Sequence, residues 1–200
     1  MSRNRTTDPF YAQAKKEAYR ARSAFKLLEI EKVFCVFDRV DTVVDLCAAP
    51  GSWSQVLRES LPKATVVAVD IQKMAPIEGV TVLLQDITKP EAVEVIEKNL
   101  PNSLAGLVVC DGAPDVSGLH DLDEFLQEDI LQNAFRIAKG VLCRGGSFVA
   151  KIFCKDGKTS IQNDFIAFFE KVSVFKPESS RKHSREHFLV CETYLKEERR

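Results

Sequence analysis

The sequence predicts one α/β domain built on a doubly wound, three-layer, mostly parallel sheet of seven strands. Short, β-branched and almost continuously apolar runs alternate with segments of helical periodicity, which is typical of strands buried on both faces and joined by right-handed crossovers. The last two apolar runs have no helix between them, so we expect them to pair as an antiparallel edge. The 200 residues, 45% of them hydrophobic, suffice for a single domain over 1–200.

The elements follow one another with short connections. A helical pattern of apolar residues at three- and four-residue steps opens the chain over 8–32. Strands are then expected at 42–47, 64–71, 80–86, 104–112, 146–153, 172–176 and 187–195. Further helices are expected at 52–61, 90–99, 122–142 and 160–171.

Charge gives only local hints about a partner. The net charge is −1 and the sequence pI about 6.3, so the whole molecule does not have the basic excess that is typical of a nucleic-acid-binding chain. Basic residues do gather over 1–32 and again over 176–185, whereas 121–129 is acidic. Each cluster taken alone is equally well explained as a solvated face.

The six cysteines are scattered, form no CxxC pair and mostly lie inside apolar runs, which indicates reduced core residues of an intracellular protein. The N-terminus has no apolar signal segment, and nowhere do 18 apolar residues run together. We therefore expect a cytoplasmic protein. His183 and His187 stand four apart, but no Cys, Asp or Glu cluster completes a metal site, so no metal is expected.

Ligands of such folds lie beyond the carboxyl ends of the strands. The segment 45–53, DLCAAPGSW, ends the first strand and opens a helix through a turn of small residues that contains Gly51. It lacks the three-glycine fingerprint of dinucleotide sites, which disfavours a nicotinamide dehydrogenase. Asp70 ends the second strand, from which an acidic side chain can accept hydrogen bonds from a ribose diol. Asp86 ends the third strand, where it could receive an adenine amino group.

Acidic residues after successive strands, without a phosphate cradle, suit an adenosine that carries a positive sulfonium and an amino acid. S-adenosylmethionine fits this description. Each aspartate alone could equally be a helix cap or a loop residue. Trp53 could equally pack between helix and sheet.

Two further residues suggest chemistry. Asp111 follows the fourth strand in a loop rich in Gly, Pro, Asp and Ser, and Lys151 interrupts the otherwise apolar run 146–153. A buried lysine is costly unless it is paired or functional. Burial and a neighbouring cation would both lower the pKa of Lys151 and make it a base near neutral pH. Lys26, taken alone, would be assigned to a solvated helix face, and Glu186 to a loop or an edge strand.

Seven segments together resemble the FtsJ (RrmJ-like) family of RNA ribose 2′-O-methyltransferases, in order and spacing, along almost the whole chain. They are YRARSAFKLLEI, VVDLCAAPGSWSQVL, VAVDI, LQDIT, VVCDGAPDVSG, FVAKIF and SSRKHSREHF. The resemblance implies a Rossmann-like methyltransferase sheet, S-adenosylmethionine as cofactor, and a catalytic tetrad of Lys26, Asp111, Lys151 and Glu186. The cofactor contacts that it implies are Gly51, Ser52, Trp53, Asp70, Ile71, Asp86, Ile87 and Asp111.

The implied mechanism is an in-line displacement in which a ribose 2′-hydroxyl attacks the sulfonium methyl. Lys151 would take the hydroxyl proton, Asp111 and Lys26 would orient Lys151 and the hydroxyl, and Glu186 would position Lys151 or the ribose. The sulfonium is already an activated leaving group, so placing the nucleophile is the larger task.

Within the family, the chain most resembles the eukaryotic tRNA enzymes that methylate anticodon-loop nucleotides, cytidine 32 and guanosine 34, with a separate helper protein that selects the position. Single-stranded loops are also where one ribose can be splayed into a pocket. An rRNA or mRNA-cap ribose methyltransferase is the alternative, and a catalytically silent RNA-binding scaffold is a third. The candidate RNA contacts are Arg20, Arg22, Arg181 and Arg185.

Overall fold

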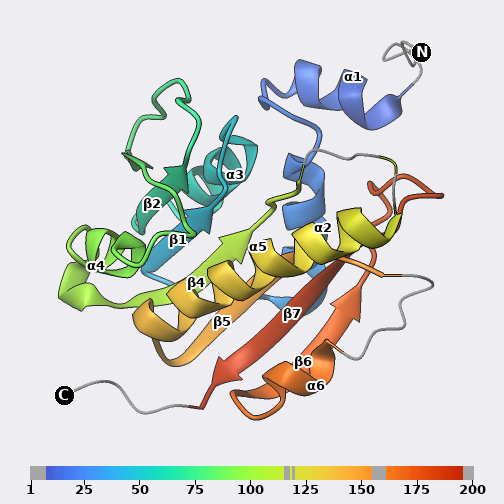
Figure 1. Cartoon of the computed structure of the whole chain (residues 1–200). Coiled ribbons are helices and arrows are strands. Elements are labelled where there is room, and N and C mark those ends of the chain that lie inside the picture. The colour runs from blue at the N-terminus through green and yellow to red at the C-terminus, as the bar shows by residue number, and fades with distance from the viewer. Residues whose placement is uncertain (1–7, 115–117, 119, 155–160, 196–200) are drawn as a thin grey trace.

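A computed structural model describes residues 8–114, 118, 120–154 and 161–195. Seven strands form one sheet in the order β3-β2-β1-β4-β5-β7-β6 (Figure 1). The strands are β1 Thr42–Leu46, β2 Thr65–Asp70, β3 Val80–Leu84, β4 Ala105–Cys110, β5 Leu142–Phe153, β6 Phe169–Phe175 and β7 Glu186–Tyr194. The predicted seven-stranded, mostly parallel sheet is confirmed.

The C-terminal strands do pair antiparallel, but the last strand, β7, lies between β5 and β6 and is antiparallel to both. Only β7 is therefore reversed, and β6 forms the edge. Burial explains this order, because β7 is buried continuously over 187–191 whereas β6 exposes Glu170 and Lys171.

The helices are α1 Pro9–Lys16, α2 Ala24–Phe34, α3 Ser52–Ser60, α4 Ala92–Glu97, α5 His120–Val141 and α6 Gln162–Phe165. The single helix expected over 8–32 is wrong, because two helices separated by 17–23 occupy that stretch. Ala18 has a φ of 60°, which a right-handed helix cannot contain, and the Arg20 N–H donates to Gln55 on α3 instead. No helix among the described residues has both the length and the apolar character of a bilayer span.

The helix expected over 160–171 shrinks to the four residues of α6, and β6 already begins at Phe169. Apolar spacing alone could not distinguish the two states, because Phe165 and Phe169 are both buried and both pack their rings near Phe135 of α5. Tertiary contacts thus decide where the helix stops.

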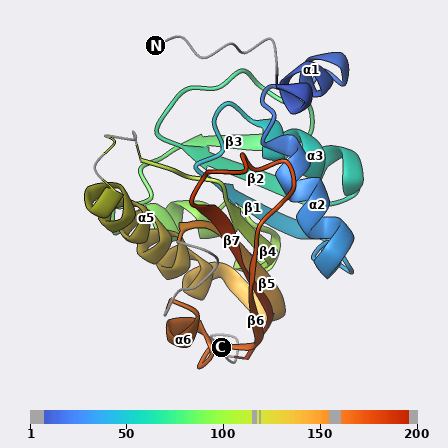
Figure 2. The same ribbon diagram turned by 90° about the vertical axis from the view of Figure 1, so that its right-hand side faces the viewer.

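The sheet separates two cores, as the three-layer prediction requires. The α4, α5 and α6 helices cover one face and α2 and α3 the other, and Figure 2 shows α5 and α2 on opposite sides of the strands. Fully buried residues such as Val44 and Val66 make up the two cores. Burial of each such side chain stabilises the fold by roughly 1.5–3 kcal/mol. Because β1, β2, β4 and β5 are parallel, the residues at their carboxyl ends meet at one edge of the sheet.

Candidate active site

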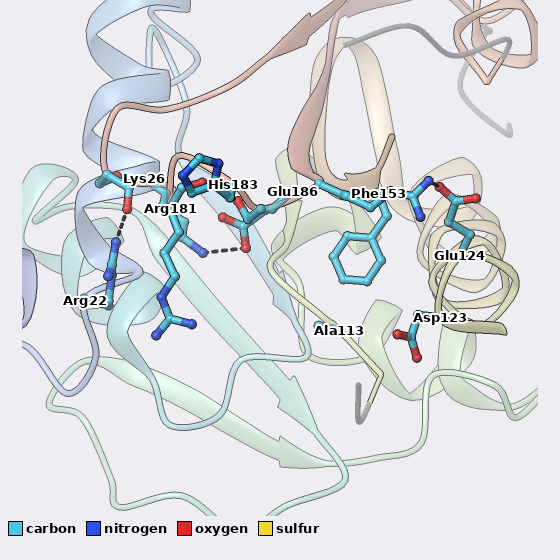
Figure 3. Close-up of a pocket in the computed structure, with 12 residues that line it drawn as sticks. Arg22, Lys26, Ala113, Asp123, Glu124, Phe153, Arg181, His183 and Glu186 are labelled. Atoms are coloured by element: carbon cyan, nitrogen blue, oxygen red, sulfur yellow. Dashed lines mark hydrogen bonds and ion pairs between the residues drawn. The ribbon is translucent and has the colours of Figure 1, made fainter. Parts of the chain in front are cut away.

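Four charged side chains from separate parts of the sequence meet at this edge. Lys26 comes from α2, Asp111 follows β4, Lys151 lies in β5 and Glu186 opens β7. Lys26 Nζ lies 2.7 Å from Glu186 Oε2 (Figure 3). Lys151 Nζ lies 2.7 Å from Asp111 Oδ1 and 3.6 Å from Glu186 Oε2. The predicted tetrad thus forms one continuous chain of alternating charges.

The strand ends that carry this chain are fixed by backbone contacts. Lys151 is buried, and its Nζ also donates to the backbone carbonyl of Asp111 at 2.7 Å. The buried amide of Gln127 on α5 donates to the carbonyls of Lys151 and Gly112, at 3.0 and 3.1 Å. The buried ammonium is therefore fully engaged, as a charge in the interior must be.

The protonation of Lys151 differs from the expectation. Burial works to lower the pKa of Lys151, but the carboxylates of Asp111 and Glu186 outweigh it and raise the pKa above the ordinary lysine value. The predicted lowering was wrong because two anions, rather than a cation, are its nearest charged neighbours. Lys151 therefore holds its proton near neutral pH in this arrangement.

Glu186 is the opposite case. Burial would raise the pKa of Glu186, but Lys26 and Lys151, together with hydrogen bonds from Lys26 and Ser180, lower it to about 2. Ser180 Oγ donates to Glu186 Oε1 at 2.7 Å. Glu186 is consequently ionised at physiological pH and links the two lysines.

A second group of carboxylates lies where β1, β2 and β4 end. Asp70 accepts hydrogen bonds from the N–H groups of Ala49 and Gln72, at 2.8 and 2.7 Å, which ties the turn after β1 to the end of β2. Gly51, the N-cap residue directly before α3, has a φ of 104°, a conformation that suits glycine. The turn of small residues after β1 is therefore held against the end of β2.

Asp45 is the residue that the sequence analysis missed. It is buried in β1, one residue before the strand ends. Its Oδ2 accepts a hydrogen bond from Ser54 Oγ at 2.6 Å, and its Oδ1 has no hydrogen-bond partner in the described part of the chain. Burial raises its pKa to about 7 against the lowering effect of Ser54, with Asp111 and Asp70 adding to the increase. A charged residue inside an apolar strand, the signal that singled out Lys151, could have found it.

The other predicted cofactor contacts divide into two groups. Trp53, Ser52 and Ile87 are buried: the Trp53 indole donates to the Ser23 carbonyl at 2.8 Å, Ser52 Oγ lies 2.7 Å from Ser23 Oγ, and Ile87 lies in a core. Ile71, by contrast, is 67% exposed after β2. Asp86 is partly exposed, and its Oδ1 accepts from both the N–H and the hydroxyl of Thr88.

The four candidate RNA-binding arginines have different surroundings. The Arg20 guanidinium donates to the carbonyls of Pro50, Ala75 and Pro76, at 3.0, 2.6 and 2.8 Å, which favours a bracing role beside the turn after β1. Arg22 bonds Asp8 and the Ser179 carbonyl, and Arg185 pairs with Glu124. Within the described residues, only Arg181 among the four has a guanidinium without a hydrogen-bond or ion-pair partner.

A cavity of about 610 Å³ opens beside the tetrad. Lys26 and Glu186 form part of its wall, together with Phe153, Arg181 and His183 (Figure 3). Its volume is in the range of pockets that hold a small ligand. The described residues contain no cluster of three or more His, Cys, Asp or Glu side chains suited to a metal ion.

Comparison with known proteins shows which family the chain belongs to. The chain is 50% identical to a tRNA (cytidine(32)/guanosine(34)-2′-O)-methyltransferase of Schizosaccharomyces pombe, over 94% of the chain and 70% of that protein. It is 49% identical to the human protein of the same name, of which it covers 58%. A solved structure named as a ribosomal RNA methyltransferase from Plasmodium falciparum superposes with a TM-score of 0.77 at 22% identity, over 88% of this chain and 99% of that one, and supports the fold. The FtsJ-like methyltransferase model matches residues 19–194, and the chain therefore belongs to this family.

Proposed function

We propose that the protein transfers a methyl group from S-adenosylmethionine to the ribose 2′-hydroxyl of tRNA, at anticodon-loop positions 32 and 34. The observation that carries the proposal is the buried chain Lys26–Glu186–Lys151–Asp111 beside a cavity of about 610 Å³. Two observations support the choice of RNA: the chain belongs to the FtsJ-like family, and the names of its relatives include cytidine 32 and guanosine 34 of tRNA.

The carboxylates at the sheet edge fit this cofactor. The buried Oδ1 of Asp45 has no hydrogen-bond partner in the described part of the chain, and Asp70 and Asp111 lie near enough to raise the pKa of Asp45. Together these carboxyl groups offer acceptors to a ligand that carries a sulfonium and an ammonium. Asp70 would hold the ribose diol, and Asp86 with the exposed Ile71 would contact the adenine. Gly51, Ser52, Trp53 and Ile87 would contribute through their backbone. When bound, the cofactor supplies an electrophilic methyl group on a positively charged sulfur.

In this proposal the tetrad places and deprotonates the hydroxyl. Glu186, ionised at physiological pH, holds Lys26 in the cavity wall and helps to fix Lys151. Lys26 can donate a hydrogen bond to the incoming ribose oxygen, and Lys151 accepts its proton at Nζ in the fraction of molecules in which that nitrogen is neutral. Fixing the nucleophile in line supplies the larger part of the acceleration.

The test is transfer of labelled methyl to purified tRNA and, separately, to rRNA, by the wild type and Lys151→Ala. Loss of the base should reduce transfer by roughly 10²- to 10⁴-fold without changing S-adenosylmethionine affinity. Lys98→Ala, which removes an exposed ion pair on α4, is the matched control and should keep full activity. The product should resist alkali at the modified 3′ linkage.

Two outcomes would contradict the proposal. Label in rRNA but not in tRNA would favour the alternative rRNA enzyme. Cofactor binding without transfer to any RNA, with or without cell extract as a source of a partner, would favour the scaffold function.

We further propose that a separate helper protein selects the tRNA position. The net charge is −1, and at the described cavity wall most cationic side chains are already paired. This wall therefore offers few of the phosphate contacts that supply most RNA affinity. Full methylation of tRNA at physiological salt by the purified chain alone would contradict this. The cytoplasmic location stays a prediction.

A further inference from the structure

Phe153 is a partly buried ring that belongs to neither core. Of the chain's 13 phenylalanines, all except Phe125 and Phe153 lie in one of the two cores or form a pair with another aromatic ring. Phe125 is simply exposed, on α5. Phe153 instead lines the cavity, and Figure 3 shows its ring pointing into the space between Glu186 and Asp123.

The strand register places this ring beside the tetrad. Side chains alternate along a strand, and Ile152 lies in the core under α5, so Lys151 and Phe153 share the opposite face. Phe153 is also the direct antiparallel partner of Glu186 in the β5–β7 ladder. Directly opposed side chains on one face are neighbours, so the ring adjoins the carboxylate that links Lys26 and Lys151.

The rest of the cavity wall suits the other parts of a nucleotide. Arg181 and His183 line it together with Phe153, and Arg181 brings a guanidinium without a partner among the described side chains. A nucleotide whose ribose lies against the Lys26–Glu186 pair therefore has an aromatic surface on one side and a cation within the same cavity. An unstacked base is recognised by such aromatic surfaces.

We infer that Phe153 is the stacking surface for the base of the nucleotide whose ribose is methylated. The inference rests on the proposed function and deepens it, because stacking would fix the 2′-hydroxyl relative to the tetrad. Every base has a π-face, so stacking tolerates different bases. This agrees with relatives whose names combine a cytidine and a guanosine target.

The experiment uses an anticodon stem-loop RNA with 2-aminopurine at position 34, a base whose fluorescence is quenched when it stacks. Wild type and Phe153→Tyr should quench the probe, whereas Phe153→Leu, which keeps apolar volume but loses the ring, should not. Phe153→Leu should also raise the KM for unlabelled tRNA roughly 5- to 100-fold, with S-adenosylmethionine affinity unchanged. Phe125→Leu, the same change at an exposed ring, is the control and should behave as wild type.

The inference is overturned if Phe153→Leu quenches the probe and methylates tRNA with the wild-type KM. It is equally overturned if Phe153→Leu loses cofactor affinity and thermal stability together with RNA binding, because the ring would then be structural. Failure of the proposed function looks different, since the wild type itself would then transfer no methyl group to tRNA even with cell extract as a source of the helper protein.

Discussion

At the scale of single residues, the proton on Lys151 governs how the proposed reaction should respond to pH. Asp111 and Glu186 raise the pKa of Lys151 despite its burial, so near neutral pH only a small fraction of molecules has the neutral amine. As long as the pH is below the pKa of Lys151, that fraction grows about tenfold for each unit by which the pH rises.

We therefore expect the single-turnover rate of methyl transfer, at saturating cofactor, to rise with pH from 6.5 to 9.5 with a logarithmic slope near one. Glu186→Gln removes one of the two raising carboxylates and should move the profile to lower pH, although the rate itself falls. A rate that reaches its plateau below pH 8 in the wild type would show that Lys151 is not the titrating base.

Arg20 gives a second prediction at this scale. Its guanidinium joins Pro50, in the turn after β1, to Ala75 and Pro76 in the loop after β2. Arg20→Ala should weaken S-adenosylmethionine binding about tenfold, since each lost hydrogen bond from a charged group is worth about 1.5–3 kcal/mol before the loops relax. Calorimetric titration with the cofactor measures this, with Arg144→Ala as the control on the exposed surface. A change in RNA affinity without a change in cofactor affinity would instead mean that Arg20 contacts RNA, as the sequence predicted.

Sequence could identify chemistry at some residues and not at others. Lys151 was visible from the sequence because it breaks an apolar strand, and Asp45 carries the same signal. Arg20 and Arg22 could not be told apart, since their partners come from residues far away in the chain: Ala75 and Pro76 for Arg20, and Ser179 for Arg22. Charge alone marks a side chain as able to bind a phosphate, but burial and competing acceptors decide whether it is free to do so.

At the scale of elements, α2 holds the loop between β6 and β7. The Glu29 carboxylate on α2 accepts hydrogen bonds from the backbone N–H groups of Glu178 and Ser179, at 2.5 and 3.0 Å. The same loop carries Ser180, which bonds Glu186, and Arg181, which lines the cavity. One helix therefore positions both Lys26 and the cavity wall opposite β5.

Glu29→Ala should release this loop. We expect the KM for tRNA to rise about tenfold and the melting temperature to fall by several degrees, since two hydrogen bonds to a charged group are lost and 1 kcal/mol corresponds to about 2–4 °C in a chain of this size. Glu91→Ala, at an exposed position before α4, is the matched control. An unchanged KM with reduced stability would mean that the loop keeps its position without Glu29.

The boundaries and order of the elements could be predicted from the sequence only in part. Strand identity followed from continuous apolar runs, and the alternation with helices gave the sheet. The place of β7 between β5 and β6 depends on which strand can tolerate an edge, and the division of the first helix depends on the Arg20 N–H bonding Gln55 of α3. Both are long-range contacts, which a local period does not contain.

At the scale of the whole molecule, near-neutral charge means that RNA binding depends on a few local cations rather than on a broad field. Arg181 lies at the cavity, and its guanidinium has no partner among the described residues. Burial lowers the pKa of Arg22, and the nearby charge of Arg181 lowers it further. Two neighbouring guanidinium groups favour an anion between or beside them. A phosphate of the bound RNA is such an anion.

We expect Arg181→Ala to weaken tRNA binding several-fold and to make the slope of log affinity against log salt less negative by about 0.7 to 0.9, because one phosphate contact releases about that many counterions. Cofactor affinity should not change. Arg144, exposed near the start of β5 and so at the opposite end of that strand from Lys151, supplies the control Arg144→Ala, which should keep the wild-type slope. Filter binding between 50 and 200 mM salt measures both. An equal change of slope in the two variants would mean that the RNA senses only net charge, whereas a change confined to Arg181→Ala places a phosphate at the cavity beside the tetrad.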